Sequence, residues 1–172
     1  MKNRLIILSD IYGLKNSAWL EDYSNYLNQY FQIKLYDILK LAEIGENISN
    51  LKKVHYLFVK NGIDKAVSNL ISLETQEIYV LGFSLGGTIA WISGLNGLKI
   101  KSLFAVSSTR LRYETEKPKT NIKLIYGEKD EYIPNKNWFL NMDLSAEFVL
   151  NQRHEFYKEK KFIKQICDTL LD

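Results

Sequence analysis

The sequence contains few cysteines, prolines and histidines, and the shortage of cysteine excludes a disulfide-stabilised fold. Among its 172 residues there are one cysteine, two prolines and two histidines. A single cysteine cannot form an internal disulfide. Cys167 falls on the apolar face of a predicted helix together with Ile163 and Ile166, so we interpret it as part of the core. We expect a reducing compartment, no metal site and no cofactor.

Long hydrophobic runs are also lacking, as is a large excess of charge of either sign. The first apolar run, Leu5 to Leu8, is too short for a signal peptide, and no later run is long enough to span a membrane. We therefore expect a cytoplasmic protein with no membrane span. The formal net charge is +3, and the lysine pairs stand beside acidic residues in helical patterns. We interpret them as solvated helix faces and expect no nucleic-acid partner.

What remains is the composition of an ordinary globular domain, and the pattern along the chain indicates its class. Apolar residues make up 46% and charged residues 25%, which suits one domain over residues 1–172. Continuous apolar runs predict strands at residues 5–8, 33–37, 77–83, 100–106, 122–126 and 146–150. Helical patterns lie between and after them, at residues 18–30, 47–73 (with a break near Asn61 and Gly62), 87–95, 134–140 and 158–171. This alternation predicts an α/β fold with a mostly parallel six-stranded sheet covered by helices on both faces.

The segment YVLGFSLGGTIAW, Tyr79 to Trp91, places a serine between two glycines where a predicted strand turns into a predicted helix. Serine beside glycine is also common turn chemistry, so the motif alone is ambiguous. A strand–serine–helix turn is the context that a nucleophile elbow requires. A Cβ at Gly82 or Gly86 would collide where strand and helix nearly touch. The helix N-terminus under Ser84 would favour developing negative charge.

A nucleophilic serine needs a base and an orienting acid, and in a parallel sheet these should also follow strand ends. His154 comes four residues after Leu150, directly beyond the last predicted strand. The other histidine, His55, sits within a helical stretch and is interpreted as structural. Asp130 lies just past the predicted strand that ends at Tyr126, although an aspartate there also suits a turn. Together these residues give the chain order Ser, Asp, His.

These segments resemble the α/β-hydrolase family. The matching residues are GFSLGG (Gly82 to Gly87), YGEKDEYIP (Tyr126 to Pro134) and NQRHEF (Asn151 to Phe156), and the resemblance covers nearly the whole chain. It implies that Ser84 is the nucleophile, His154 the base and Asp130 the orienting acid. Glu131 is one residue out of place for the acid. The implied fold is a minimal α/β-hydrolase domain.

The resemblance also implies an oxyanion hole made by two backbone N–H groups. One belongs to Leu85, which follows the nucleophile. The other comes from the loop after the first strand, where the family usually has His-Gly and this chain has Ser-Asp-Ile-Tyr-Gly. Counting back from Gly13 places the donor at Tyr12, and counting forward from the strand places it at Ile11. We prefer Tyr12.

The segment that carries a lid in the family is short here. Only residues 107–120 separate the fourth and fifth predicted strands, which is too few for a helical cap domain. We therefore predict a shallow, open groove above the serine, bordered by the substrate-binding residues Ile11, Leu111 and Tyr113 together with Tyr12. Such a groove favours a substrate that is large or that a partner delivers.

The resemblance specifies a mechanism better than a substrate. Esters, thioesters and some amides fit, so the predicted partner is a small-molecule or carrier-protein-bound acyl ester. SDIYGL is similar to dienelactone hydrolases, and YGLKNSAW with GFSLGG is similar to the methyl esterases that act on pimeloyl-carrier protein in biotin synthesis. Arg110, Arg112 and Arg153 are candidate contacts for an acidic carrier, although we prefer to interpret Arg110 and Arg112 as part of a solvated loop. A generic small-ester hydrolase and a non-catalytic binding module are the alternatives.

Overall fold

Six strands pair side by side in one sheet in the computed structural model, which describes residues 2–15, 17–45, 48 and 50–171. The order across the sheet is β2-β1-β3-β4-β5-β6. Every neighbouring pair is parallel, whereas the sequence predicted a mostly parallel sheet. The predicted six-stranded α/β sheet is confirmed. The strands are β1 (Asn3–Leu8), β2 (Phe31–Tyr36), β3 (Ile78–Phe83), β4 (Ile100–Val106), β5 (Asn121–Gly127) and β6 (Glu147–Val149).

Helices connect these strands, and most fall where the sequence predicts them. The longer ones are α1 (Ala18–Leu27), α4 (Ile63–Leu73), α5 (Leu85–Leu95) and α7 (Lys160–Leu171), and the shorter ones are α3 (Leu51–Leu57) and α6 (Lys136–Met142). Two short 3₁₀ helices, η2 (Thr109–Tyr113) and η3 (Phe156–Lys158), follow β4 and β6. Of the helix expected at 47–73, residues 47 and 49 lie outside the described residues. A π-helical turn, Phe58–Gly62, stands at its predicted break.

One short helix, α2 (Ile38–Leu41), was not predicted. Asp37, expected at the end of the second strand, instead caps this helix, because its carboxylate accepts hydrogen bonds from the N–H groups of Leu39 and Lys40. Four residues are too few to show a helical repeat in the sequence.

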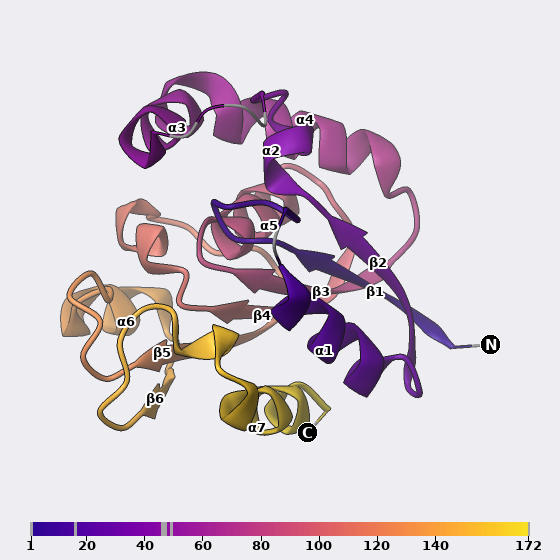
Figure 1. Cartoon of the computed structure of the whole chain (residues 1–172). Coiled ribbons are helices and arrows are strands. Elements are labelled where there is room, and N and C mark those ends of the chain that lie inside the picture. Colours follow the sequence, from indigo (N-terminus) through magenta and orange to yellow (C-terminus); the bar gives the residue numbers. More distant parts are fainter. Residues whose placement is uncertain (1, 16, 46–47, 49, 172) are drawn as a thin grey trace.

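Helices cover both faces of the sheet, with α2 to α5 on one face and α1 and α7 on the other (Figure 1). Successive residues of a strand point to opposite faces, so β1 supplies both cores. Ile6 and Leu8 pack with α4 and α5, whereas Leu5 and Ile7 pack with α1 and α7. All four side chains are fully buried, which explains why the run shows no alternation of polar and apolar residues.

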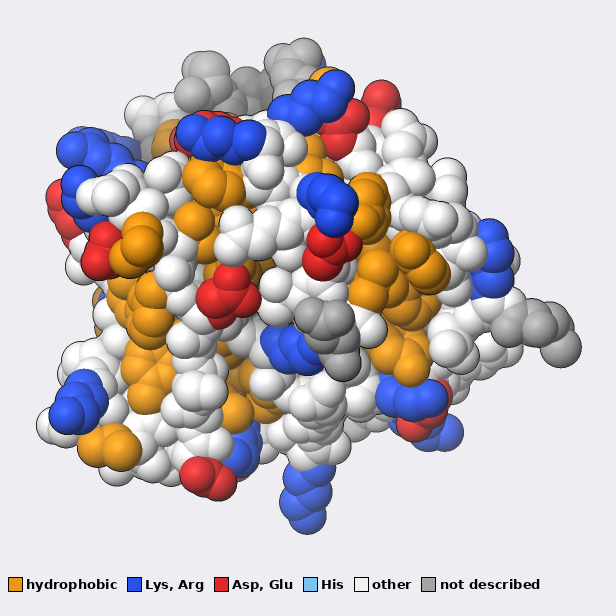
Figure 2. Space-filling view, turned by 90° about the horizontal axis from the view of Figure 1, so that it is seen from below, with side chains coloured by type: hydrophobic (Ala, Val, Ile, Leu, Met, Phe, Trp, Pro, Cys, Tyr) orange, Lys and Arg blue, Asp and Glu red, His pale blue; other side chains and the backbone are white. Residues whose placement is uncertain are grey.

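Three expectations from the composition concern Cys167, the surface lysines and a membrane span. Cys167 is fully buried, as predicted, and burial raises the pKa of its thiol to about 12. On the face seen in Figure 2, Lys and Arg side chains lie interspersed with acidic and apolar ones. Within the described residues, no helix combines the length and the apolar character needed to cross a membrane.

The strand order determines where a site can form. The chain passes from β1 outward to β2 and then returns to β3 on the other side of β1, so the connections diverge between β1 and β3. In open parallel sheets, ligands bind beyond the carboxyl ends of the strands at such a switch point. The loop after β1 and the β3–α5 turn with Ser84 meet there.

Candidate active site

Ser84 occupies a strained turn between β3 and α5. Its backbone dihedrals are φ 49° and ψ −118°, a conformation that side-chain-bearing residues rarely adopt. The turn is possible because Gly82 and Gly87 nearly touch: a Cβ on Gly82 would lie 2.5 Å from the Cα of Gly87. A Cβ on Gly86 would lie 2.3 Å from the carbonyl oxygen of Ser9, in the loop after β1. Gly82 and Gly86 are therefore both required because backbone atoms approach them closely, as the sequence predicts.

Three side chains from three strand ends form one hydrogen-bonded row. Ser84 Oγ lies 2.9 Å from His154 Nε2, and His154 Nδ1 lies 2.6 Å from Asp130 Oδ2. A carboxylate can only accept, so Nδ1 carries the proton in this bond and Nε2 is free to accept the serine proton. The Asp130 side chain is almost fully buried, whereas that of His154 is 34% exposed. His154 thus bonds to Asp130 and not to the neighbouring Glu131, which is exposed.

Asp130 and His154 are positioned by contacts between their two loops. Asp130 Oδ1 accepts the N–H of Tyr132 at 3.1 Å, which leaves Oδ2 directed at the histidine. The N–H of Lys129 donates to the carbonyl of Gln152 at 2.7 Å. A Cβ on Gly127 would lie 2.5 Å from that same carbonyl oxygen, so only glycine allows the loops to approach this closely.

Ser107 is a supporting residue that the sequence analysis missed. It is fully buried just after β4, has a positive φ of 51°, and donates its hydroxyl to the carbonyl of His154 at 2.7 Å. It therefore anchors the backbone that carries the His154 side chain. A serine following a strand is common turn chemistry, so its position alone carried no signal that it would contact His154.

Two residues that line a hollow over Ser84 have a backbone N–H that no other described residue accepts. Among the described residues, the N–H groups of Leu85 and Ile11 make no hydrogen bond, and both residues line the same hollow. The N–H of Tyr12 is occupied, because it donates to Asp10 Oδ1 at 3.1 Å. This bond favours Ile11 over Tyr12, the residue that we preferred from the sequence, and the identity of the second oxyanion donor stays a prediction.

Asp10 is a buried carboxylate that holds this loop in place. Its Oδ2 accepts the hydroxyl of Tyr157 at 3.0 Å and pairs with Lys158 Nζ at 2.9 Å. Burial raises the pKa of the Tyr157 phenol well above its usual value, and the Asp10 charge adds to the effect. Burial acts to lower the pKa of Lys158, but its hydrogen bonds to Glu155 and Asp10 outweigh this and raise it. The cluster ties the loop after β1 to the segment that follows His154.

A hollow of about 760 Å³ lies over Ser84. Its floor and sides come from the loops after five strands, and helix α3 adds a wall through Leu51, Lys52 and His55. This wall was not predicted from the sequence, which indicated a shallow groove, because nothing local shows which way a surface helix packs. Within the described residues, His, Cys, Asp and Glu form no group of three or more suited to hold a metal ion.

Two of the expected border residues do not line the hollow. Ile11 and Tyr12 do, but Leu111 is fully buried in the core that contains α4 and α5. Tyr113 is 60% exposed and lies outside the lining, where its ring contacts Arg112. Leu111 does not line the hollow because η2 turns this side chain into the core, whereas Tyr113 is exposed outside the lining, and η2 presents its arginines to the hollow instead.

Comparison with known proteins identifies the family and the fold. The family model of the phospholipases and carboxylesterases matches residues 13–171. No curated protein is similar enough in sequence to be matched. Among solved structures, a predicted CIB-like hydrolase from Thermoplasma acidophilum aligns with a TM-score of 0.69 and 17% identity, covering 98% of this chain and 86% of that one.

Two further structures are similar in fold. One comes from work on carboxylesterases of Nitrososphaera gargenis, with a TM-score of 0.68, 13% identity, and coverage of 99% of this chain and 90% of that one. The other is Est1E from Butyrivibrio proteoclasticus, with a TM-score of 0.65, 12% identity, and coverage of 98% and 85%. At these identities the likeness concerns the fold alone.

Proposed function

Because the chain belongs to the phospholipase/carboxylesterase family of α/β-hydrolases, we propose that it is a serine hydrolase that cleaves carboxylic esters or thioesters. The observation that carries the proposal is the row Ser84–His154–Asp130, with separations of 2.9 and 2.6 Å. A nucleophile, a base and an orienting acid within hydrogen-bond reach are what acyl transfer to serine requires.

The proposed reaction begins at Ser84. Its Oγ attacks the acyl carbon while His154 Nε2 takes the hydroxyl proton, and the buried Asp130 stabilises the imidazolium that forms. His154 then gives the proton to the leaving alcohol or thiol, which departs and leaves an acyl-enzyme. Water, deprotonated by the same histidine, attacks the acyl-enzyme, releases the acid and restores the serine.

The negative charge that develops on the acyl oxygen needs donors that are already in place. The N–H groups of Leu85 and Ile11 supply them in this proposal, since neither donates to another described residue. Leu85 is also the first residue of α5, so the positive end of the helix dipole faces the same oxygen. The Asp10 contacts hold the second donor in position, which saves reorganisation during the reaction.

The proposed substrate is a small free acyl ester. The wall formed by α3 encloses more surface than an open groove would, so a small molecule gains binding energy without a partner protein. The carrier-bound ester and the link to biotin synthesis stay predictions from the sequence.

A fluorophosphonate probe tests the proposal, because it modifies an activated serine irrespective of the natural acyl group. We expect a single adduct on Ser84, located by peptide mass spectrometry, and turnover of short p-nitrophenyl esters. Ser84→Ala should lose both, while Ser72→Ala, which changes an exposed serine on α4, should retain both. A chain that neither reacts with the probe nor cleaves any ester would instead be a non-catalytic binding module.

A further inference from the structure

The hollow above Ser84 carries an excess of positive charge. Five cationic side chains line it, and within the described residues none of them forms an ion pair; they are Lys52, Arg110, Arg112, Lys129 and Arg153. Three carboxylates line it too, and of these Glu155 pairs with Lys158, so the five cations outnumber the carboxylates Asp130, Glu131 and Glu155. Unpaired cations around a partly enclosed space attract an anionic ligand.

Arg112 differs from the other four cations because its guanidinium is held in place. One terminal nitrogen, Nη1, donates to the carbonyl of Thr109 at 2.9 Å, and Nη2 donates to the hydroxyl of Tyr113 at 2.9 Å. The guanidinium carbon lies 4.3 Å from the ring centroid of Tyr113 and 5.4 Å from that of Tyr132. Two aromatic rings and two hydrogen bonds therefore fix its orientation before any ligand arrives.

This anchoring leaves binding capacity unused. A guanidinium has five N–H donors in a planar fork that matches a carboxylate. The hydrogen bonds from Arg112 to Thr109 and Tyr113 use one donor on Nη1 and one on Nη2. Because the side chain is already ordered, binding an anion costs little further rotamer entropy. Arg110 is a weaker candidate, since it also interacts with the charge of Glu114.

We propose that Arg112 binds a carboxylate of the substrate while the ester group lies at Ser84, so that the preferred substrates are half-esters of dicarboxylic acids. The inference rests on the proposed function and specifies its substrate class. The ester end is attacked at Ser84, and the free carboxylate at the other end of the chain is held by the fork of Arg112, with the remaining cations adding attraction of longer range.

Matched substrates test the proposal. The monomethyl and dimethyl esters of succinic, glutaric, adipic and pimelic acids share an acyl chain and differ by one charge. We expect kcat/KM to be about tenfold or more higher for the monoester at the best chain length, the worth of one charge-assisted hydrogen bond. The preference should be carried by KM and should weaken as salt is added.

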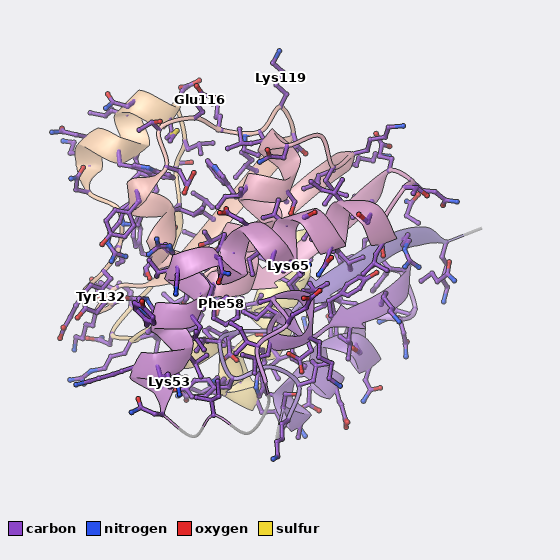
Figure 3. The ribbon with its side chains drawn as sticks, turned by 90° about the horizontal axis from the view of Figure 1, so that it is seen from above. Lys53, Phe58, Lys65, Glu116, Lys119 and Tyr132 are labelled. Carbon is purple, nitrogen blue, oxygen red and sulfur yellow. The ribbon has the colours of Figure 1, made fainter. Side chains whose placement is uncertain are left out.

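Substitutions assign the effect to its residue. Arg112→Gln should bring the ratio of the two kcat/KM values close to one, and Arg112→Lys should restore part of it because charge returns without the fork. The matched control is Lys119→Gln, which removes one positive charge at an exposed position; Lys119 projects from a part of the surface well separated from Tyr132 in Figure 3. This control should keep the wild-type ratio.

Binding without turnover separates this inference from the proposed function. Calorimetry with the Ser84→Ala variant and the free dicarboxylate should show binding that the added substitution Arg112→Gln weakens about tenfold. Labelling by the fluorophosphonate probe together with equal rates for monoesters and diesters would overturn the half-ester proposal and leave the hydrolase intact. A preference that arises only when the ester is attached to acyl carrier protein would also overturn it, in favour of a docking surface. Dicarboxylate binding without any probe labelling would overturn the hydrolase instead.

Discussion

Ser84 Oγ and His154 Nε2 lie 2.9 Å apart although 70 residues separate them in the chain. The contact exists because β3 and β6 are parallel strands of one sheet, so that the residues following each emerge at the same edge. The hydroxyl of Ser107 holds the histidine backbone, and Asp130 orients the ring. The relationship supports a division of roles between the two histidines of the chain.

The first prediction separates those histidines. His154→Ala should lower kcat for an ester substrate by about 10⁴-fold, because the serine loses its base. His55 lines the hollow from α3 but makes no contact in this row, so His55→Ala should change KM by only a few-fold. Steady-state kinetics on one p-nitrophenyl ester measures both. A larger loss for His55→Ala would show that the base has been assigned to the wrong residue.

The second prediction concerns the oxyanion donor in the loop after β1. Ile11→Pro removes the N–H, fixes φ and replaces the isoleucine side chain, and it should lower kcat by about 10²-fold or more with a smaller change in KM. Ile11→Ala keeps the N–H and is the matched control, which we expect to retain kcat. Circular dichroism and the melting temperature show whether the proline variant is folded. Equal kcat values for the folded proline and alanine variants would exclude Ile11 as a donor.

The third prediction concerns the glycine that allows the turn at Ser84. A Cβ on Gly82 would lie 2.5 Å from the Cα and 2.6 Å from the N of Gly87, which are backbone atoms that cannot move independently. Gly82→Ala should therefore lower the free energy of unfolding by about 3 kcal/mol, the cost of overpacking. Gly45→Ala is the control, since a Cβ there meets nothing within 4 Å. Urea unfolding of both variants measures the difference, and a wild-type midpoint for Gly82→Ala would contradict the close approach.

The fourth prediction is a pH dependence of stability that arises far from the hollow. Glu74 accepts two hydrogen bonds from Arg4, both at 2.7 Å, and one from the Tyr36 hydroxyl at 2.6 Å. Burial acts to raise the pKa of Glu74, but the bonds from Arg4 and Tyr36 outweigh it and hold this pKa below its usual value of 4.5. Because this pKa is lowered in the folded state, the ionised Glu74 stabilises the fold fully above pH 4.5, and this stabilisation is lost as the pH falls through the folded-state pKa.

Glu74→Gln should accordingly lower the free energy of unfolding at pH 7 by about 2 kcal/mol, and the difference from wild type should shrink below pH 4. Glu43→Gln is the matched control, because Glu43 pairs with Lys65 on the surface with a side chain that is 61% exposed. Denaturant titrations between pH 3 and pH 8 provide the measurement. If the difference in the free energy of unfolding between wild type and Glu74→Gln stayed constant over that range, the ionisation of Glu74 would not contribute to stability as we expect.

The sequence by itself determined the α/β class and nominated Ser84, Asp130 and His154. It could do so because continuous apolar runs identify buried parallel strands, and residues that follow such strands meet at one edge of the sheet whatever the details of packing. The glycines around Ser84 were predictable for a similar reason. Their need arises within a single turn, where only a few neighbouring residues decide the geometry.

Only the tertiary structure decided which neighbours complete the site. The N–H of Tyr12 is occupied by the Asp10 carboxylate, which Tyr157 and Lys158 hold from the other end of the chain. The burial of Leu111, the bond from Ser107 to His154 and the wall supplied by α3 likewise depend on contacts between distant segments. Such contacts leave no periodic pattern in the sequence, because side-chain direction within a loop is set by what packs against it.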